Sequence, residues 1–162
     1  MTDVAAAFVE RLDAVKARLR ALAPRDAPEG ALTAPDPPTG ERWEAGQVWA
    51  HLAEFIPYWL GEASLVIERG MTEPVAFGRS KSDPGRISAI ERDRRGDRGA
   101  LWNRTAAGIA SLHAFLLGLD ASAWEAGGRH SILGDMGLAR IVDEFLIGHL
   151  EQHALQLEGL LL

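Results

Sequence analysis

The 162-residue sequence contains no cysteine, and this absence excludes several kinds of chemistry at once. Disulfide bonds, cysteine nucleophiles and metal sites built on thiolates cannot form within the chain. Any metal ion that it binds must be held by imidazole, carboxylate or water. A chain of this length can bury a hydrophobic core without cross-links, so we expect a single domain over residues 1–162.

Positive charge is also scarce. The 17 lysines and arginines are outnumbered by 23 acidic residues, which gives a formal net charge of −6, and the only lysines are Lys16 and Lys81. A chain with this balance has no positive field to attract nucleic acid or anionic lipid, so we expect neither as a partner. Arginine in place of lysine, with much alanine and glycine, is typical of a bacterial protein from a GC-rich genome.

Long apolar runs are missing as well. No window approaches the roughly 18 consecutive apolar residues of a membrane-spanning helix. The first 20 residues, MTDVAAAFVERLDAVKARLR, lack the uninterrupted apolar core of a signal peptide. We therefore expect a cytoplasmic protein that is not associated with a membrane.

Apolar residues recur at spacings of three and four along most of the chain, which predicts amphipathic helices. We expect four, over about residues 3–23, 43–70, 86–119 and 138–161, with a weak point in the third at Gly96 and Gly99. Segments rich in proline and glycine separate them, and no alternating strand pattern is visible. The predicted fold class is all-α, with a four-helix bundle as the architecture.

Two histidines lie inside the apolar stripe of the last helix. When residues 138–160 are projected at about 100° per residue, His149 and His153 fall on the apolar half, while Ile147 and Leu155 fall on the acidic half. Buried imidazoles need hydrogen-bond partners or a metal ion. The spacing alone leaves both interpretations open, because HxxxH is common by chance.

His51 supplies a third imidazole. It lies at the margin of the apolar face of the second helix, one turn from Glu54. Ligand sites in helical bundles are built from inward-facing side chains on facing helices, so His51 can meet His149 and His153 if the two helices are neighbours. Three imidazoles leave coordination positions open for water or substrate, which is the pattern of a catalytic site. Zinc, nickel, iron and manganese all remain compatible with such ligands.

Two segments of the chain resemble the DinB-like (DinB/YfiT-like) family. Residues 43–52, WEAGQVWAHL, are similar to the segment that precedes its first metal histidine, and residues 130–157, HSILGDMGLARIVDEFLIGHLEQHALQL, are similar to its final loop and helix. The resemblance implies a four-helix bundle of up-down-down-up topology, metal ligands at His51, His149 and His153, and often a homodimer. It also implies a divalent metal ion at one end of the bundle, for which we expect zinc or nickel, with iron or manganese as alternatives.

The same resemblance implies relatives among transferases and isomerases that use bacillithiol, mycothiol or glutathione. Our leading hypothesis is a metal-dependent thiol S-transferase acting on small electrophilic molecules. A low-molecular-weight thiol such as mycothiol would bind the open coordination position and be deprotonated there. We predict that Trp49, Trp59 and Trp102 belong to the core, with an apolar wall of the pocket as the alternative. Arg79, Lys81 and Arg86 are the candidate cations for an anionic group.

Three other interpretations stay open. The first is a metal-dependent hydrolase with Glu54 or Glu151 as general base, although Glu151 projects away from the histidines. The second is a non-catalytic stress protein that binds a metal or a ligand. The third is a metal-free bundle whose histidines lie apart and are separately hydrogen-bonded. The predicted exposure of Ile147 and Leu155 is a weak argument for a homodimer.

Overall fold

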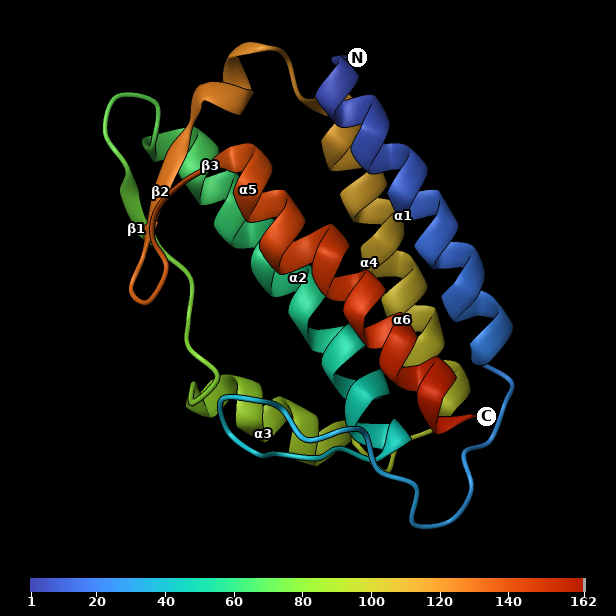
Figure 1. Ribbon diagram of the computed structural model, residues 1–162. Helices are drawn as coiled ribbons and strands as arrows, with labels where there is room; N and C mark the ends of the chain where they lie inside the picture. The colour runs from blue at the N-terminus through green and yellow to red at the C-terminus, as the bar shows by residue number, and fades with distance from the viewer. Residues whose placement is uncertain (162) are drawn as a thin grey trace.

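The computed structural model describes residues 1–161, which are mostly helical (Figure 1). The helices are α1 (Asp3–Leu22), α2 (Ala45–Arg69), α3 (Pro84–Asp93), α4 (Arg98–Gly118), α5 (Leu138–Val142) and α6 (Gly148–Leu160). A short 3-10 helix covers Ser122–Glu125, and a π-helical turn covers Asp143–Ile147. Among these residues no helix has both the length and the apolar content that crossing a membrane requires.

The long helices lie side by side around one core. α1 packs against α4 and α6, and α2 packs against the same two helices. In Figure 1, α1 and α6 run in one direction, α2 and α4 run in the other, and α3 lies across one end. The core between them is formed by large side chains with almost no exposed surface, including Leu12, Leu52, Phe55, Ile109 and Leu112. The prediction of a mostly helical chain is confirmed.

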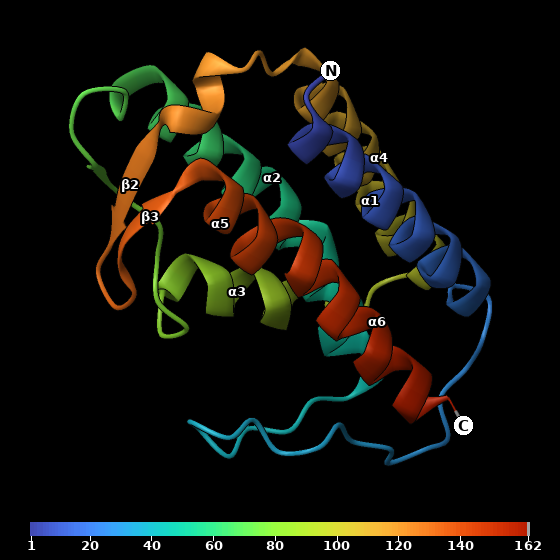
Figure 2. The same ribbon diagram turned by 45° about the horizontal axis from the view of Figure 1, so that its top comes forward.

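A three-stranded sheet, which the sequence did not predict, lies at one end of the helices. Its strands are β1 (Val75–Phe77), β2 (Gly127–His130) and β3 (Gly134–Gly137). β1 pairs in parallel with β2, β2 pairs antiparallel with β3, and the β2–β3 hairpin leads directly into α5 (Figure 2). Strands of three or four residues with so much glycine show no alternating pattern. At Gly128 a Cβ would lie 2.4 Å from Cδ1 of Phe77, so only glycine fits this position.

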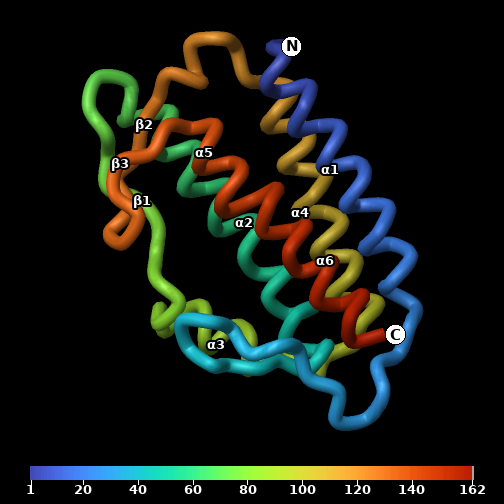
Figure 3. Tube along the Cα trace, in the orientation of Figure 1, coloured from blue at the N-terminus to red at the C-terminus, as the bar shows by residue number. Residues whose placement is uncertain are grey.

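The predicted third helix is two helices. α3 ends at Asp93 and α4 begins at Arg98, so the break falls beside the expected weak point at Gly96. The side chain of Asp97 accepts a hydrogen bond from the backbone N–H of Ala100 at 2.7 Å, which caps the new helix. α3 is thereby free to lie beside the segment that joins α1 to α2 (Figure 3).

The last helix is also interrupted, by the π turn at Asp143–Ile147. The backbone N–H of Gly148 bonds to the carbonyl of Asp143, five residues back. This wider turn rotates the faces that follow it relative to a regular α-helix. Ile147 is consequently buried, with 0% of its surface exposed, and our prediction that it is exposed was wrong. Leu155 is 62% exposed, as predicted.

Candidate metal centre

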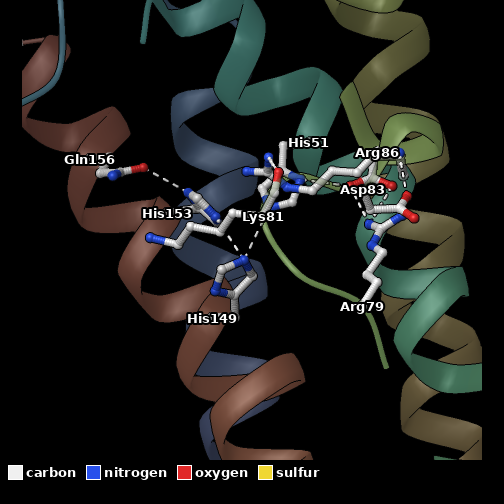
Figure 4. Close-up of polar contacts among 9 residues, drawn as sticks. His51, Arg79, Lys81, Asp83, Arg86, His149, His153 and Gln156 are labelled. Atoms are coloured by element: carbon white, nitrogen blue, oxygen red, sulfur yellow. Dashed lines mark hydrogen bonds and ion pairs between the residues drawn. The ribbon is translucent and has the colours of Figure 1, made fainter. Parts of the chain in front are cut away.

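The three histidines named from the sequence lie together. His51 comes from the first half of α2, His149 and His153 come from α6, and these two helices are in contact (Figure 4). One nitrogen of each ring can be chosen so that all three lie within 4.8 Å of one another. We refer to His51, His149 and His153 as the histidine cluster. The π turn ends directly before α6 and so sets which way both of its histidines point.

The spacing of the cluster matches a metal site. Nε2 of His149 lies 3.0 Å from Nε2 of His51 and 3.1 Å from Nε2 of His153. Zinc binds imidazole nitrogen at about 2.0–2.1 Å, which places two ligands of a tetrahedral site about 3.3 Å apart. Two of the three spacings are therefore close to that value, and all three nitrogens lie within 4.8 Å of one another.

In two of the rings, those of His51 and His153, the nitrogen that points away from the cluster is hydrogen-bonded. Nδ1 of His51 lies 2.7 Å from Oε1 of Glu54, and Nδ1 of His153 lies 2.7 Å from Oε1 of Gln156. A carboxylate or amide oxygen only accepts, so each Nδ1 is the protonated nitrogen and each Nε2 carries a lone pair. His149 can donate its own Nε2 proton to just one of them. At least one Nε2 lone pair, on His51 or His153, is therefore left without a proton to accept, and a bound cation would pair with it.

Burial keeps the cluster uncharged. His51 and His153 are 3% and 5% exposed, whereas His149 is half-buried and reaches the surface. Burial is the largest cause that lowers the pKa of each imidazole; neighbouring histidines lower the pKa of His51 and His149 further. The pKa of His153 falls to about 4. The three rings are therefore neutral near pH 7, which is the form that binds metals.

Trp43 and Phe55 form the apolar walls of the cluster. The Trp43 ring is parallel to the His153 ring, 4° apart in orientation with centroids 6.1 Å apart, and lies edge-on to His51 at 5.3 Å. Phe55 lies 4.7 Å from the His149 ring. Thr33 fixes Trp43, because its hydroxyl accepts from the Trp43 backbone N–H at 2.9 Å. Trp43 was not among the site residues expected from the sequence.

Trp49, Trp59 and Trp102 do not line the cluster: Trp49 and Trp59 are part of the core and Trp102 packs against it, as predicted. Trp49 is 1% exposed and packs edge-on against Trp102, with centroids 6.3 Å apart. Trp59 stacks on Phe145 at 4.1 Å near the sheet. A helical wheel gives the face on which a residue lies but not which residues of a neighbouring helix it meets. Trp43 precedes the first turn of α2, so a projection of that helix does not place it.

Glu54 and Arg79 form a buried ion pair beside His51. Nη2 of Arg79 lies 2.7 Å from both carboxylate oxygens of Glu54, and their side chains are 9% and 8% exposed. Burial raises the pKa of Glu54, and the Arg79 guanidinium opposes this rise. Neither residue takes the role expected of it: Glu54 holds His51 instead of facing a substrate as a base, and Arg79 is neutralised by Glu54.

The other residues that were expected near the pocket are also engaged by neighbouring groups. Glu151 pairs with Arg11 at 2.7 Å on the outer face of α6, away from the histidines as predicted. Lys81 lies 2.8 Å from both oxygens of Asp36 and is neutralised there. Arg86 donates from Nη1 to the backbone carbonyl of Lys81 at 2.8 Å, and its Cζ lies 5.3 Å from the centre of the Trp43 ring.

The remaining histidines do not join the cluster. His130, 4% exposed, ends β2 with both ring nitrogens engaged: Nε2 lies 3.2 Å from the carbonyl of Arg79, and Nδ1 accepts from the N–H groups of Ile132 and Leu133. His113 lies on α4, 4.0 Å from Asp13. Gln156 is the partner that sequence reasoning missed; its place three residues after His153 was the available signal.

The chain was compared with family models, with curated proteins and with solved structures, and none of them matches it. Any function of the chain must therefore be inferred from its own structure. The structure establishes that three neutral imidazoles lie close enough to bind one metal ion.

Proposed function

We propose that the histidine cluster binds one divalent metal ion through three Nε2 atoms. The observation that carries this proposal is the convergence of these nitrogens while Glu54 and Gln156 hold two of the rings by Nδ1. A carboxylate or amide on the outer nitrogen is the usual support of a metal-bound histidine. Zinc and nickel suit three imidazoles best, with iron or manganese as alternatives.

We further propose that the chain is a DinB-like four-helix bundle whose metal centre serves a thiol S-transferase. The two resembling segments include all three histidines, and the long helices run in the directions that an up-down-down-up bundle requires. A divalent ion held by three imidazoles lowers the pKa of a thiol bound in a remaining position. Because the chain has no cysteine, the thiol would come from a small co-substrate.

The residues around the cluster favour transfer over hydrolysis. Glu54 is committed to His51 and Arg79, and Glu151 is paired with Arg11, so neither carboxylate can serve as the base expected for a hydrolase. Trp43 and Phe55 exclude water from two sides of the imidazoles. His149 is the half-buried member, so a small electrophile would approach from its side.

The first test is the metal content of the protein purified without a histidine tag. We expect about one divalent ion per chain, and its loss in the His149→Ala/His153→Ala variant. His113→Ala is the matched control, because His113 lies on the surface of α4 and should leave the metal content unchanged. Absence of metal in the unmodified protein, even after reconstitution, would overturn the proposal.

A second measurement separates the enzyme from a binding protein. The metal-loaded protein is mixed with a small thiol and an electrophilic chromophore such as 1-chloro-2,4-dinitrobenzene. A thiol-dependent rate that disappears in the double-histidine variant supports the transferase. Bound metal with no rate above background for a panel of thiols would leave a non-catalytic metal-binding protein.

A further inference from the structure

One cation beside the histidine cluster has no acidic partner. Arg86 lies in the first turn of α3, where Asp83 caps the helix by accepting from the Arg86 backbone N–H at 2.8 Å. Its guanidinium lies over the ring of Trp43, the same ring that packs against His51 and His153. Figure 4 shows the side chain extending from α3 toward the histidines.

The charges around it are otherwise balanced. Arg79 is neutralised by Glu54 and Lys81 by Asp36. Arg86 makes no ion pair with a carboxylate anywhere in residues 1–161, and Glu41, Glu54 and Asp36 act on its guanidinium only through longer-range attraction. Burial lowers the pKa of Arg86, yet a guanidinium remains protonated at neutral pH. A half-buried guanidinium without a directly paired carboxylate thus lies beside the cluster.

The donors of Arg86 remain available to a ligand. Nη1 donates to the carbonyl of Lys81, which is the one hydrogen bond that the Arg86 side chain makes within residues 1–161, and its Cζ lies 5.3 Å from the centre of the Trp43 ring. A guanidinium has five N–H donors in a planar fork that fits two oxygens of a carboxylate or phosphate. Once a divalent ion occupies the neutral histidines, the positive charge of this region rises further.

We propose that Arg86 is an oxyanion-binding residue, so that the ligand held at the histidine cluster carries a carboxylate or phosphate group. This inference rests on the proposed metal site and adds the class of molecule that it takes. The oxyanion would accept hydrogen bonds from N–H groups of the Arg86 guanidinium, while another atom of the same molecule would coordinate the metal ion. Arg86 then selects anionic thiols over neutral thiols of the same size.

The test compares two probes of equal length on the Co²⁺-loaded protein, 3-mercaptopropionate and 3-mercapto-1-propanol. Binding of either thiol is followed by the change in the cobalt absorption spectrum. A hydrogen-bonded ion pair should favour the anionic thiol by roughly tenfold or more. In Arg86→Gln this preference should fall to near parity, whereas binding of the neutral thiol is unchanged. Arg86→Lys should keep part of the preference.

Arg20→Gln is the matched control, because Arg20 is an exposed arginine on α1 and its loss changes the net charge equally. The control should keep the full preference. The cobalt spectrum without thiol and the melting temperature report whether Arg86→Gln is folded. An unchanged preference in a folded, cobalt-loaded Arg86→Gln would overturn the oxyanion role and leave the metal site standing. Failure of the unmodified protein to bind Co²⁺, or to respond to either thiol, would overturn the proposed function as well.

Discussion

The carboxylate of Glu54 accepts a hydrogen bond from Nδ1 of His51 at 2.7 Å and is itself held by Arg79 at the same distance. Glu54 therefore fixes the tautomer of His51 and makes its Nε2 a stronger ligand. Replacement by an amide weakens this support. We expect Glu54→Gln to lower the metal affinity by about 10–100-fold, measured by competition with a chromophoric chelator.

Glu54→Gln also leaves Arg79 without its partner, so its effect on folding must be separated from its effect on the metal. Gln156→Leu removes the acceptor of His153 without disturbing a buried charge and should lower the affinity in the same direction. Glu10→Gln, an exposed change on α1, should have no effect. Wild-type affinity in both Glu54→Gln and Gln156→Leu would contradict the supporting role.

The second prediction concerns the π turn before α6, which we expect to set the orientation of His149. A Cβ at Gly148 would lie 2.7 Å from the carbonyl oxygen of Asp143, the oxygen that this turn places against residue 148. Gly148→Ala should therefore destabilise the protein by about 1–3 kcal/mol and rotate His149 away from His51. Denaturant unfolding and metal affinity would report the two effects.

Gly159→Ala provides the control within the same helix, since a Cβ there meets nothing within 4 Å. Alanine is the better helix former, so this variant should be neutral or more stable by up to about 1 kcal/mol. If both alanine variants behave alike, the π turn does not position the histidines.

Acid should destabilise the metal-free protein. Burial holds the pKa of His153 at about 4, against 6.5 for an ordinary histidine, and lowers the pKa of its two neighbours as well. Below pH 6.5 the unfolded chain therefore binds more protons than the folded one, and stability falls as the pH falls toward 4. His153 alone accounts for a loss of roughly 3 kcal/mol by pH 4.

The measurement is the urea midpoint of the metal-free protein between pH 7 and pH 4. His153→Gln should flatten the dependence, because the unfolded variant has one proton fewer to bind. A midpoint that stays constant over this range would mean that the imidazoles are not buried in the neutral form.

His130 is predicted to contribute to stability and not to metal binding, unlike the three histidines of the cluster. Its ring nitrogens are engaged by backbone groups, and its ring packs among Trp59, Phe77 and Phe145. His130→Ala should cost about 2–4 kcal/mol of stability through a cavity and unpaired N–H groups, with metal affinity unchanged. Loss of bound metal in a folded His130→Ala protein would show that the metal site extends to the sheet.

Helical periodicity placed the three histidines on apolar faces, but it left their meeting open, and the resemblance to the DinB-like family was needed to predict one shared site. His149 and His153 follow from a spacing of four on an apolar face, and His51 from its place on a second such face. The partners of the rings were harder to assign. Glu54 was recognised as a neighbour of His51 but given the role of a base, because sequence does not reveal that Arg79 reaches it from a loop 25 residues away.

The sheet and the π turn were beyond prediction for different reasons. β1 and β2 are separated by some 50 residues and gain their pairing only from tertiary structure. The π turn has no periodic signal of its own, so projection of residues 138–160 as one regular helix placed Ile147 on the wrong side. His149 and His153 nevertheless lie on the side of α6 that meets His51, as the projection placed them.

The hydrogen bond between His130 and the Arg79 carbonyl joins the sheet to the residues that support the histidine cluster. From β2 the connection passes through Arg79 to Glu54 and on to His51, each link a hydrogen bond. Binding at the two ends of this chain of contacts is therefore coupled. If a bound ion makes these contacts more rigid and so favours binding of a molecule to the β2–β3 hairpin, that molecule must raise the affinity for the ion by the same factor. Ile132, 69% exposed at the hairpin tip, lies where such a molecule would make contact.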